Sequence, residues 1–496
     1  MIPKILLAFL LCFFFGFFTV SLVWPDRLRA RSLIIRCCLA IGFGFGISSC
    51  WFFLWLCLAG GHGENFFTLM LPELAVTVSL GVDYFGFRGR SSPSTPLDHV
   101  RGVCEKNLLS RIVSLVFYVV LACAVLSFLL ISLKNPHGDY DATSTWNLRA
   151  RLLARETVHW RDAFVDSQHH SRANLDYPLL LPATVARAWK YAGKEPVSVP
   201  IVVAFLFTFS SVGLIYSSLS FLRNKWIGYL GGIVLLGVYS FVDLGAWQYA
   251  DVVVGWFMLS TIVILGIYDA LPKNQTRGLL ALMGAAAGFC AWSKNEGQLF
   301  LLLVLTVRLL SLILRKDWKL VARQATAIVY GLLPVLAVLA YFKLAVAPAN
   351  SWVSPDTNPA GHPIQYFLEP GSVAQKLTNV SRYWVIAKAM LTEILNLGGR
   401  TLGITPLLLL YFIFAKVKRN SLVTAKTGIS VLALMLAGYF SVYLVTPLEL
   451  TYHLRSSLSR LLLQLWPSAV FVFFMATSPA APLAFQRCSS PVIDES

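Results

Sequence analysis

The chain has 496 residues, of which 57% are hydrophobic and only 13% are charged. Soluble domains carry about 25% charged residues, so this composition excludes an ordinary soluble protein and predicts a chain solvated mainly by lipid. The formal net charge is +17. Because most of the cations lie in short loops between apolar runs, we interpret them as signals of membrane orientation and expect no nucleic-acid partner.

Apolar runs of near-spanning length recur along the whole chain, at about thirteen places. We therefore predict an all-α polytopic membrane protein with about thirteen transmembrane helices. The first run is long and lacks a small-residue cleavage site, so we expect a retained span and not a removed signal peptide. The expected spans are 2–23, 37–59, 66–86, 111–133, 199–221, 228–247, 251–269, 278–293, 298–314, 326–347, 402–416, 428–446 and 460–477.

The connecting loops alternate in character. One set is rich in arginine and lysine and is expected to be cytoplasmic, because positive residues in short loops stay inside. This set includes the loops at 27–36, 88–106, 223–225, 273–277, 315–323 and 416–426. The other set carries the conspicuous polar clusters, which predicts a cavity at the outer face. The N-terminus is then outside, and the tail at 478–496 is cytoplasmic.

The outer loop at 135–199 is too long to be a simple connector, and we expect it to be partly helical. Trp146, Ala150 and Leu153 recur at helical spacing, which predicts a helix from Ala142 to Glu156. We expect this helix to lie along the membrane interface with its tryptophan among the lipid headgroups.

Asp139 and Asp141 stand just before this helix. Asp141 could serve only as the helix N-cap, a position that favours aspartate. Alternatively, it could act as a general base that takes the proton from an attacking hydroxyl. Asp139 could be a solvated loop charge, or it could share a cation with Asp141.

Two further carboxylates stand where a loop meets a span. Prolines follow Asp176 and favour an extended backbone that would fix its direction, although an ordinary junction explains it equally well. Asp251 begins a span, where a carboxylate either caps the helix or faces a cavity.

The remaining candidates are mostly cations. Lys294 could neutralise a phosphate as a point charge, or it could merely pair with Glu296. Arg455 and Arg460 could make bidentate contacts to a phosphate, whereas Arg460 could instead extend toward the headgroups. His453 belongs to the same outer cluster. The histidines lack convincing metal-ligand spacing, so we expect no metal site built from them.

Several short motifs together resemble the C-type (GT-C) membrane glycosyltransferases, which include protein O-mannosyltransferases and lipid A aminoarabinose transferases. The motifs are Asp139-Tyr-Asp141-Ala, Trp146-Asn-Leu-Arg-Ala150, Asp176-Tyr-Pro-Leu-Leu-Leu-Pro182, Gln248-Tyr-Ala-Asp251, Trp292-Ser-Lys-Asn-Glu-Gly297 and Arg460-Leu-Leu-Leu-Gln-Leu-Trp-Pro467. Many members carry an adjacent Asp-Glu pair, whereas Tyr140 separates the two aspartates here, which leaves open whether Asp139 or Asp141 corresponds to the family's base.

This resemblance implies an organisation in three parts. Residues 1–110 would be an N-terminal addition of three spans, residues 111–477 a GT-C-like catalytic domain whose first outer loop is catalytic, and residues 478–496 a tail.

It also implies an activity, which is inverting transfer of a sugar from a polyprenyl-phosphate donor to a glycan, lipid or protein acceptor at the outer face of a bacterial inner membrane. Asp141 would be the base. Asp176, with Asp251, Glu296 and His453, would orient the substrate or a cation, and Lys294, Arg455 and Arg460 would bind the donor phosphate. A divalent cation such as Mg²⁺ or Mn²⁺ is left open.

Two other functions remain in view. A glycan ligase or polymerase of the O-antigen type would also use a polyprenyl donor, but its large loop is expected late in the chain, whereas the long loop here comes early. A secondary transporter or flippase would need ionisable residues deep within spans. Asp243, Arg308 and Glu393 are the few candidates, and each is near a predicted span end or loop.

Overall fold

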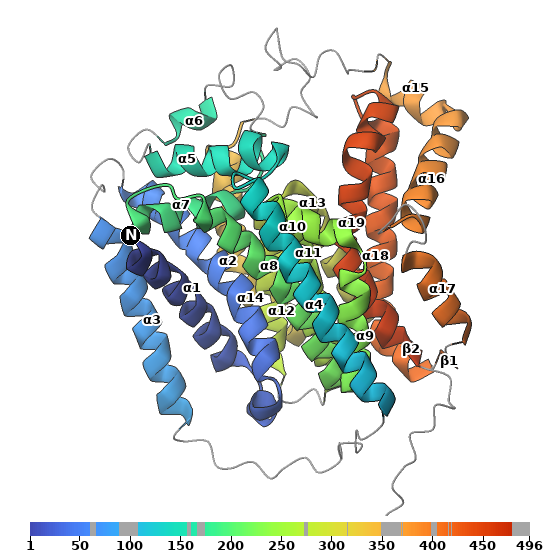
Figure 1. Ribbon diagram of the computed structural model, residues 1–496, viewed down its shortest axis with the longest axis horizontal. Coiled ribbons are helices and arrows are strands. Elements are labelled where there is room, and N and C mark those ends of the chain that lie inside the picture. The colour runs from blue at the N-terminus through green and yellow to red at the C-terminus, as the bar shows by residue number, and fades with distance from the viewer. Residues whose placement is uncertain are drawn as a thin grey trace, which may run out of the picture.

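The computed structural model describes residues 1–59, 66–88, 108–155, 160–165, 174–271, 276–314, 316–348, 369, 371–397, 404–414, 416–417 and 419–478. Figure 1 shows its long helices packed side by side in a bundle. The short helices α5 (Asn147–Arg155), α6 (Asp162–Val165) and α7 (Leu180–Ala192) lie at one end, which we call the α5 end. The two-residue strands β1 (Lys416–Val417) and β2 (Thr477–Ser478) pair at the opposite end, the β1 end.

Three N-terminal helices form one side of the bundle, drawn in blue in Figure 1. They are α1 (Ile2–Val23), α2 (Leu33–Ala59) and α3 (Phe66–Arg88), with the 3₁₀ turn η1 (Asp26–Arg31) between the first two. They pack against α7, and α2 also packs against the next long helix of the bundle, α8 (Ser198–Leu222). The assignment of residues 1–110 as an addition to a catalytic domain stays a prediction.

The middle of the chain builds the centre of the bundle. Helix α4 (Leu108–Lys134) leads to the α5 end, where the π-helical turn η2 (Ala142–Trp146) precedes α5. The later helices are α9 (Lys225–Leu236), α10 (Tyr239–Ala246), α11 (Ala250–Ala270), α12 (Arg277–Ser293), α13 (Asn295–Ile313) and α14 (Trp318–Ala345). Every residue in the most apolar part of α11 is buried, which makes this helix the core of the bundle.

The C-terminal helices stand on the other side of the bundle. They are α15 (Val373–Thr378), α16 (Val380–Leu395), α17 (Ile404–Phe414), α18 (Arg419–Val445) and α19 (Leu450–Ala476). Helix α19 packs against both α11 and α18, so it joins this side to the core. The predicted tail lies outside the described residues from position 479 onward.

The described helices confirm an all-α polytopic membrane protein but do not support the expected count of thirteen spans. Ten helices are long and apolar enough to cross a membrane, or eleven if the bent pair α9 and α10 forms one span. That pair turns by 66°. The other two expected spans, 278–293 and 402–416, correspond to α12 with 17 residues and α17 with 11, and both are too short to qualify.

A buried polar network joins the N-terminal helices to α7. The Glu73 carboxylate of α3 is fully buried, and its Oε2 accepts hydrogen bonds from Arg187 Nε at 3.0 Å and from the Tyr191 hydroxyl at 2.6 Å. Its Oε1 accepts one from the Ser48 hydroxyl at 2.9 Å. Both carboxylate oxygens of Glu73 therefore have partners within the protein. Buried charges persist when they are paired and hydrogen-bonded in this way.

The helix expected from 142 to 156 is present as η2 and α5, but the expected position of its tryptophan among lipid headgroups is wrong. Trp146 is only 2% exposed, and its ring stacks on Tyr177 with ring centres 5.8 Å apart. Arg149 is equally buried and donates to the Tyr177 carbonyl oxygen at 2.6 Å. This segment therefore buries its aromatic ring against the chain before α7, and not among lipid headgroups.

Candidate active site

Polar side chains from distant parts of the chain meet at the α5 end, where α11 and α13 begin and α19 passes. We call this group the polar cluster. It contains Asp139, Asp141, Asp176, Tyr249, Asp251, Lys294, Asn295, Glu296, Arg460 and Gln464. All ten residues lie in the sequence motifs described above. The structure therefore gathers the ends of several helices into one site.

Asp141 and Arg460 form an ion pair although they are 319 positions apart in the sequence. Arg460 Nη1 donates to Asp141 Oδ2, and the two side chains are 24% and 25% exposed, respectively. Asp141 has helical backbone angles, and its side chain makes no capping hydrogen bond. The capping explanation for Asp141 therefore lacks support, and Arg460 points into the protein instead of extending toward headgroups.

Tyr249 connects this ion pair to the second aspartate. The Arg460 guanidinium lies over the Tyr249 ring, 5.3 Å from its centre, and the Tyr249 hydroxyl donates to Asp139 Oδ2 at 3.3 Å. Burial, together with the neighbouring Asp141 carboxylate, raises the pKa of the Tyr249 hydroxyl well above its ordinary value. The hydroxyl is therefore protonated at neutral pH and serves as a hydrogen-bond donor to Asp139, which is itself exposed.

Lys294 lies between two carboxylates. Its Nζ is 3.0 Å from Asp251 Oδ1 and 2.9 Å from Glu296 Oε1, and its side chain is only 4% exposed. Burial alone would lower the pKa of Lys294, but the two carboxylates raise it above its ordinary value. Lys294 is thus charged and already fully compensated. This makes it a weaker phosphate ligand than Arg460, which faces a single carboxylate directly.

Gln464 holds Asp251 from the side of α19. Its Nε2 donates to Asp251 Oδ1 at 2.6 Å, while its Oε1 accepts from the Tyr439 hydroxyl at 2.9 Å. Gln464 is one helical turn beyond Arg460, so both side chains project from the same face of α19. This one face therefore contacts Asp141 and Asp251 together.

Asp176 is fixed next to the start of α13. Asn295 Nδ2 donates to Asp176 Oδ2 at 2.8 Å, and Lys343 of α14 donates to the Asn295 side chain at 2.9 Å. Lys343 also donates to the Asp176 backbone carbonyl oxygen. Asp176 is buried. Its contacts therefore place the carboxylate at the edge of the polar cluster and orient it firmly.

The Asp139–Asp141 segment is held by a tight turn against the start of α11. Gly138 has φ +77°, and a Cβ atom there would lie 2.6 Å from the Ala142 Cβ and 2.7 Å from the Trp247 carbonyl oxygen. Gln248, with φ +62°, donates to the Pro136 carbonyl oxygen and accepts from Asn147. Only glycine combines this close approach with a left-handed backbone at low cost.

Several buried polar atoms of the cluster have no hydrogen-bond partner among the described residues. They are Asp251 Oδ2, Glu296 Oε2 and Arg460 Nε. A buried polar atom without a partner costs about 1–3 kcal/mol, and such atoms in a native protein call for an explanation. Two acceptors and one donor at a partly exposed site suit a ligand that carries both hydroxyl groups and an anion.

Two predicted site residues of α19 lie apart from these contacts. His453 is buried, with its ring centre 4.7 Å from that of Tyr443, on the same face as Arg460 but about two turns nearer the start of the helix. Arg455 is exposed, and its position five residues before Arg460 places it on another side of the helix. Neither contacts the carboxylates of the cluster within the described part of the chain.

The described residues contain no group of three or more histidine, cysteine or acidic side chains arranged to hold a metal ion. The sequence left a divalent cation open. In the structure the carboxylates of the cluster are paired with Arg460, Tyr249, Lys294 and Asn295 instead.

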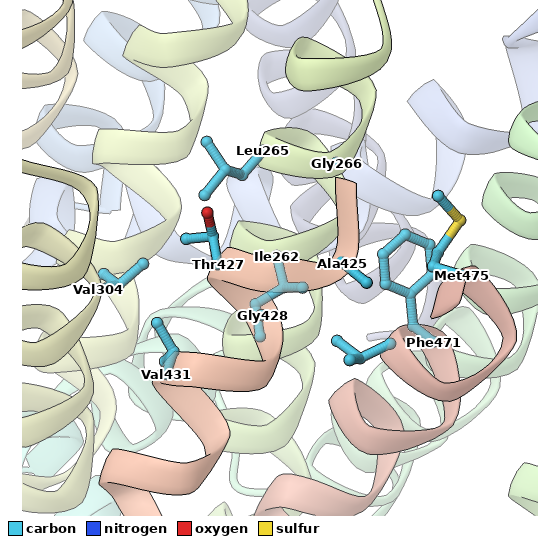
Figure 2. A pocket seen from close by; sticks show the side chains of 11 residues that line it. Ile262, Leu265, Gly266, Val304, Ala425, Thr427, Gly428, Val431, Phe471 and Met475 are labelled. Carbon is cyan, nitrogen blue, oxygen red and sulfur yellow. The ribbon is translucent and has the colours of Figure 1, made fainter. Parts of the chain in front are cut away.

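A small pocket borders the cluster directly and is lined by Asn147, Gln248 and Tyr249 together with apolar side chains. Figure 2 shows a second small pocket between α11, α13, α18 and α19, where Ile262 and Phe471 are among its apolar lining. It begins eleven residues beyond Asp251 along α11, about 16 Å toward the β1 end.

Sequence reasoning missed several residues that position the site. Gln464 stands four residues after Arg460, and this helical spacing could have identified it. Lys343 is a lone cation in an apolar run, which is itself a signal of function or of a buried partner. Arg149 gave no distinguishing signal among the neighbouring arginines, because only its burial separates it from them.

No protein-family model, no curated protein and no solved structure matches this chain.

Proposed function

We propose that this protein is an integral membrane glycosyltransferase that moves a sugar from a polyprenyl-phosphate donor to a glycan, lipid or protein acceptor. The observation that carries the proposal is the contact between Asp141 and Arg460, which brings a carboxylate and a guanidinium together at one end of a helix bundle. Inverting sugar transfer needs both groups, a base for the acceptor hydroxyl and a cation for the departing phosphate.

The chemical step is a direct displacement. The acceptor hydroxyl oxygen forms a bond to the anomeric carbon while Asp141 takes the hydroxyl proton. The bond between the anomeric carbon and the phosphate oxygen breaks, and its electron pair leaves with the polyprenyl phosphate. Arg460 stabilises the charge that grows on that phosphate, as a guanidinium does through paired N–H donors. Attack opposite the leaving group inverts the anomeric centre.

The surroundings of the cluster support a lipid-linked donor. The small pocket beside Tyr249 presents hydrogen-bonding groups that suit a sugar hydroxyl. The second small pocket, shown in Figure 2, lies farther along α11 and has a mostly apolar lining of the kind that contacts a lipid chain. The loops rich in arginine and lysine favour a site on the extracytoplasmic face of a bacterial inner membrane.

The other residues support this step. Asp139 is a second candidate base, because it is exposed and oriented by Tyr249. Asp176, Asp251 and Glu296 would accept hydrogen bonds from sugar hydroxyls. Lys294 would hold Asp251 and Glu296 in place through its two ion pairs, and Arg455 and His453 would act at the entrance from the α5 end.

Label transfer tests the proposal. Membranes that contain the protein are supplied with polyprenyl phosphate carrying a radiolabelled sugar, and both water-soluble and lipid products are separated. We expect label on an acceptor together with free polyprenyl phosphate, and we expect Asp141→Asn to slow transfer by about 10²–10⁴-fold. Asp139→Asn, assayed in parallel, decides which aspartate is the base. Unchanged transfer by both variants would refute the carboxylate mechanism.

The stereochemistry of the product gives a second test. Direct displacement predicts that the product has the opposite anomeric configuration to the donor, which proton NMR coupling constants report. Retention of configuration would contradict a mechanism with one base and no covalent intermediate.

The transporter alternative needs charged residues deep within long helices. Arg308 of α13 forms two hydrogen bonds with Asp269 and is 7% exposed, but both residues lie near the C-terminal ends of their helices. Vesicles with labelled donor on one side separate the two functions. Movement of the donor across the membrane without any transfer product would favour the transporter. Transfer of the label from a pyrophosphate-linked oligosaccharide alone would favour a ligase.

A further inference from the structure

The Asp141–Arg460 ion pair engages two groups that sugar transfer needs separately. A general base needs a free oxygen to receive the acceptor proton, and a phosphate-binding cation needs N–H groups directed at the phosphate. Here Arg460 Nη1 donates to Asp141 Oδ2, so one oxygen of the candidate base and one donor of the cation are engaged with each other. This contact opposes both proposed roles.

We propose, on the basis of the function proposed above, that the donor phosphate competes with Asp141 for Arg460 and that donor binding releases the base. Phosphate and carboxylate oxygens accept from a guanidinium in the same planar geometry, so each can replace the other. The Asp141 carboxylate thus stands where a phosphate oxygen of the donor will bind.

The surroundings of Arg460 allow this exchange without moving the guanidinium. The Tyr249 ring supports one face of it at 5.3 Å, and Arg460 Nε is buried without a partner among the described residues. A phosphate can bind the Nη1–Nη2 edge of the guanidinium with two parallel hydrogen bonds, whereas Asp141 uses only Nη1. The extra hydrogen bond gives the phosphate an advantage over the carboxylate.

Lys294 does not offer the same exchange. It contacts two carboxylates at 3.0 and 2.9 Å and is almost fully buried, so a phosphate would have to displace both. Arg460 is the more exposed cation, at 24%. The competition is therefore assigned to Arg460.

This exchange sets the order of the steps in the reaction. Before the donor binds, Asp141 is held in the ion pair with Arg460. After the donor binds, Asp141 is free to receive the proton of the acceptor hydroxyl. When the polyprenyl phosphate has left and Asp141 has given its proton to water, the ion pair forms again. Water is thus not activated at an empty site.

Binding of polyprenyl phosphate without a sugar tests the competition. The full-length protein is placed in lipid nanodiscs, and the affinity for polyprenyl phosphate is measured for the wild type and for Asp141→Asn, Asp139→Asn, Asp141→Glu and Arg460→Gln. Thermal unfolding, followed by tryptophan fluorescence, confirms that each variant is folded.

We expect Asp141→Asn to bind polyprenyl phosphate about tenfold or more tightly than the wild type, because the competing charged acceptor is removed. Asp139→Asn removes the same charge without touching Arg460 and is expected to change the affinity by no more than about fivefold. Asp141→Glu keeps the competitor and should not tighten binding. Arg460→Gln should lose binding.

Other results would overturn the inference. Equal tightening by Asp141→Asn and Asp139→Asn would show a general charge effect without competition. Binding by the wild type with no tightening in Asp141→Asn would refute competition while leaving the proposed function intact. If neither folded protein binds polyprenyl phosphate, the proposed function fails and the competition fails with it.

Discussion

Two groups of buried charges in this protein differ in how completely their carboxylates are hydrogen-bonded. In the network of α3 and α7, both oxygens of Glu73 accept hydrogen bonds, and Arg187 lies 2.7 Å from the carboxylate. In the polar cluster, Asp251 Oδ2 has no partner among the described residues, and the Asp141–Arg460 pair is partly exposed. We infer that the first group holds helices together, and we propose that the second receives a ligand.

Breaking the Glu73 network should have the largest effect on stability. Glu73→Gln leaves the Arg187 guanidinium buried without a carboxylate, which we expect to lower the free energy of unfolding by about 3–5 kcal/mol. Thermal unfolding measures this loss. The double variant Glu73→Met, Arg187→Met should recover most of the lost stability, because it leaves no uncompensated buried charge. A Glu73→Gln protein as stable as the wild type would remove the contrast between the two groups.

Gln464→Leu tests the polar cluster itself. It leaves the Tyr439 hydroxyl buried without its acceptor and removes one donor to Asp251, which should cost about 1–3 kcal/mol. Transfer should fall as well, because Asp251 loses its orientation. The control is Gln298→Leu, since Gln298 is half-buried and donates only to Asn295. An equal loss of stability and of transfer in both variants would mean that Gln464 has no specific role in orienting Asp251.

Gly138→Ala should reduce the rate of sugar transfer more than it reduces the stability of the fold. A left-handed backbone costs a residue other than glycine about 1–2 kcal/mol. Gly193→Ala is the matched control, because Gly193 has φ +69° but nothing lies within 4 Å of the added Cβ. We expect similar strain in both variants and loss of transfer only in Gly138→Ala, where the Cβ meets Ala142 and Trp247. Normal transfer by Gly138→Ala would show that the turn does not position the aspartates.

Replacing Glu449, which caps α19, should have the smallest effect on stability. Backbone N–H groups of Tyr452 and Thr451 donate to its carboxylate and lower its pKa from the ordinary value. This stabilisation is therefore present above about pH 4.5 and is lost as the pH falls through the lowered pKa. We expect Glu449→Gln to cost about 0.5 kcal/mol at pH 7, because solvent screens this exposed group. The difference from the wild type should vanish in acid, and a difference that persisted there would contradict the capping role.

The sequence was most informative where helix ends carry polar residues. The motifs around Asp141, Asp251, Lys294 and Arg460 each come at the edge of an apolar run, and the structure brings all of them to the α5 end. Periodicity located the long helices because apolar length is set by membrane thickness. It did not fix their number, since the short helices α12 and α17 and the 66° bend between α9 and α10 depend on packing.

The sequence could not predict which charged residues form ion pairs. Nothing local indicates that Arg460 contacts Asp141 while Arg455 stays exposed, because the choice depends on which face of α19 meets α11. The Glu73–Arg187 pair was missed for the same reason, as its partners are 114 positions apart. Trp146 was placed among lipid headgroups because only the fold brings Tyr177 beside it.

The most direct test compares one carboxylate from each region. The rate of sugar transfer from polyprenyl phosphate, normalised to the amount of folded protein, is measured for Asp141→Asn and Glu73→Gln. We predict a loss of about 10²–10⁴-fold for Asp141→Asn, with a rate close to that of the wild type for Glu73→Gln. A normal rate in Asp141→Asn, or an equal loss in both variants, would contradict the assignment of the polar cluster as the active site.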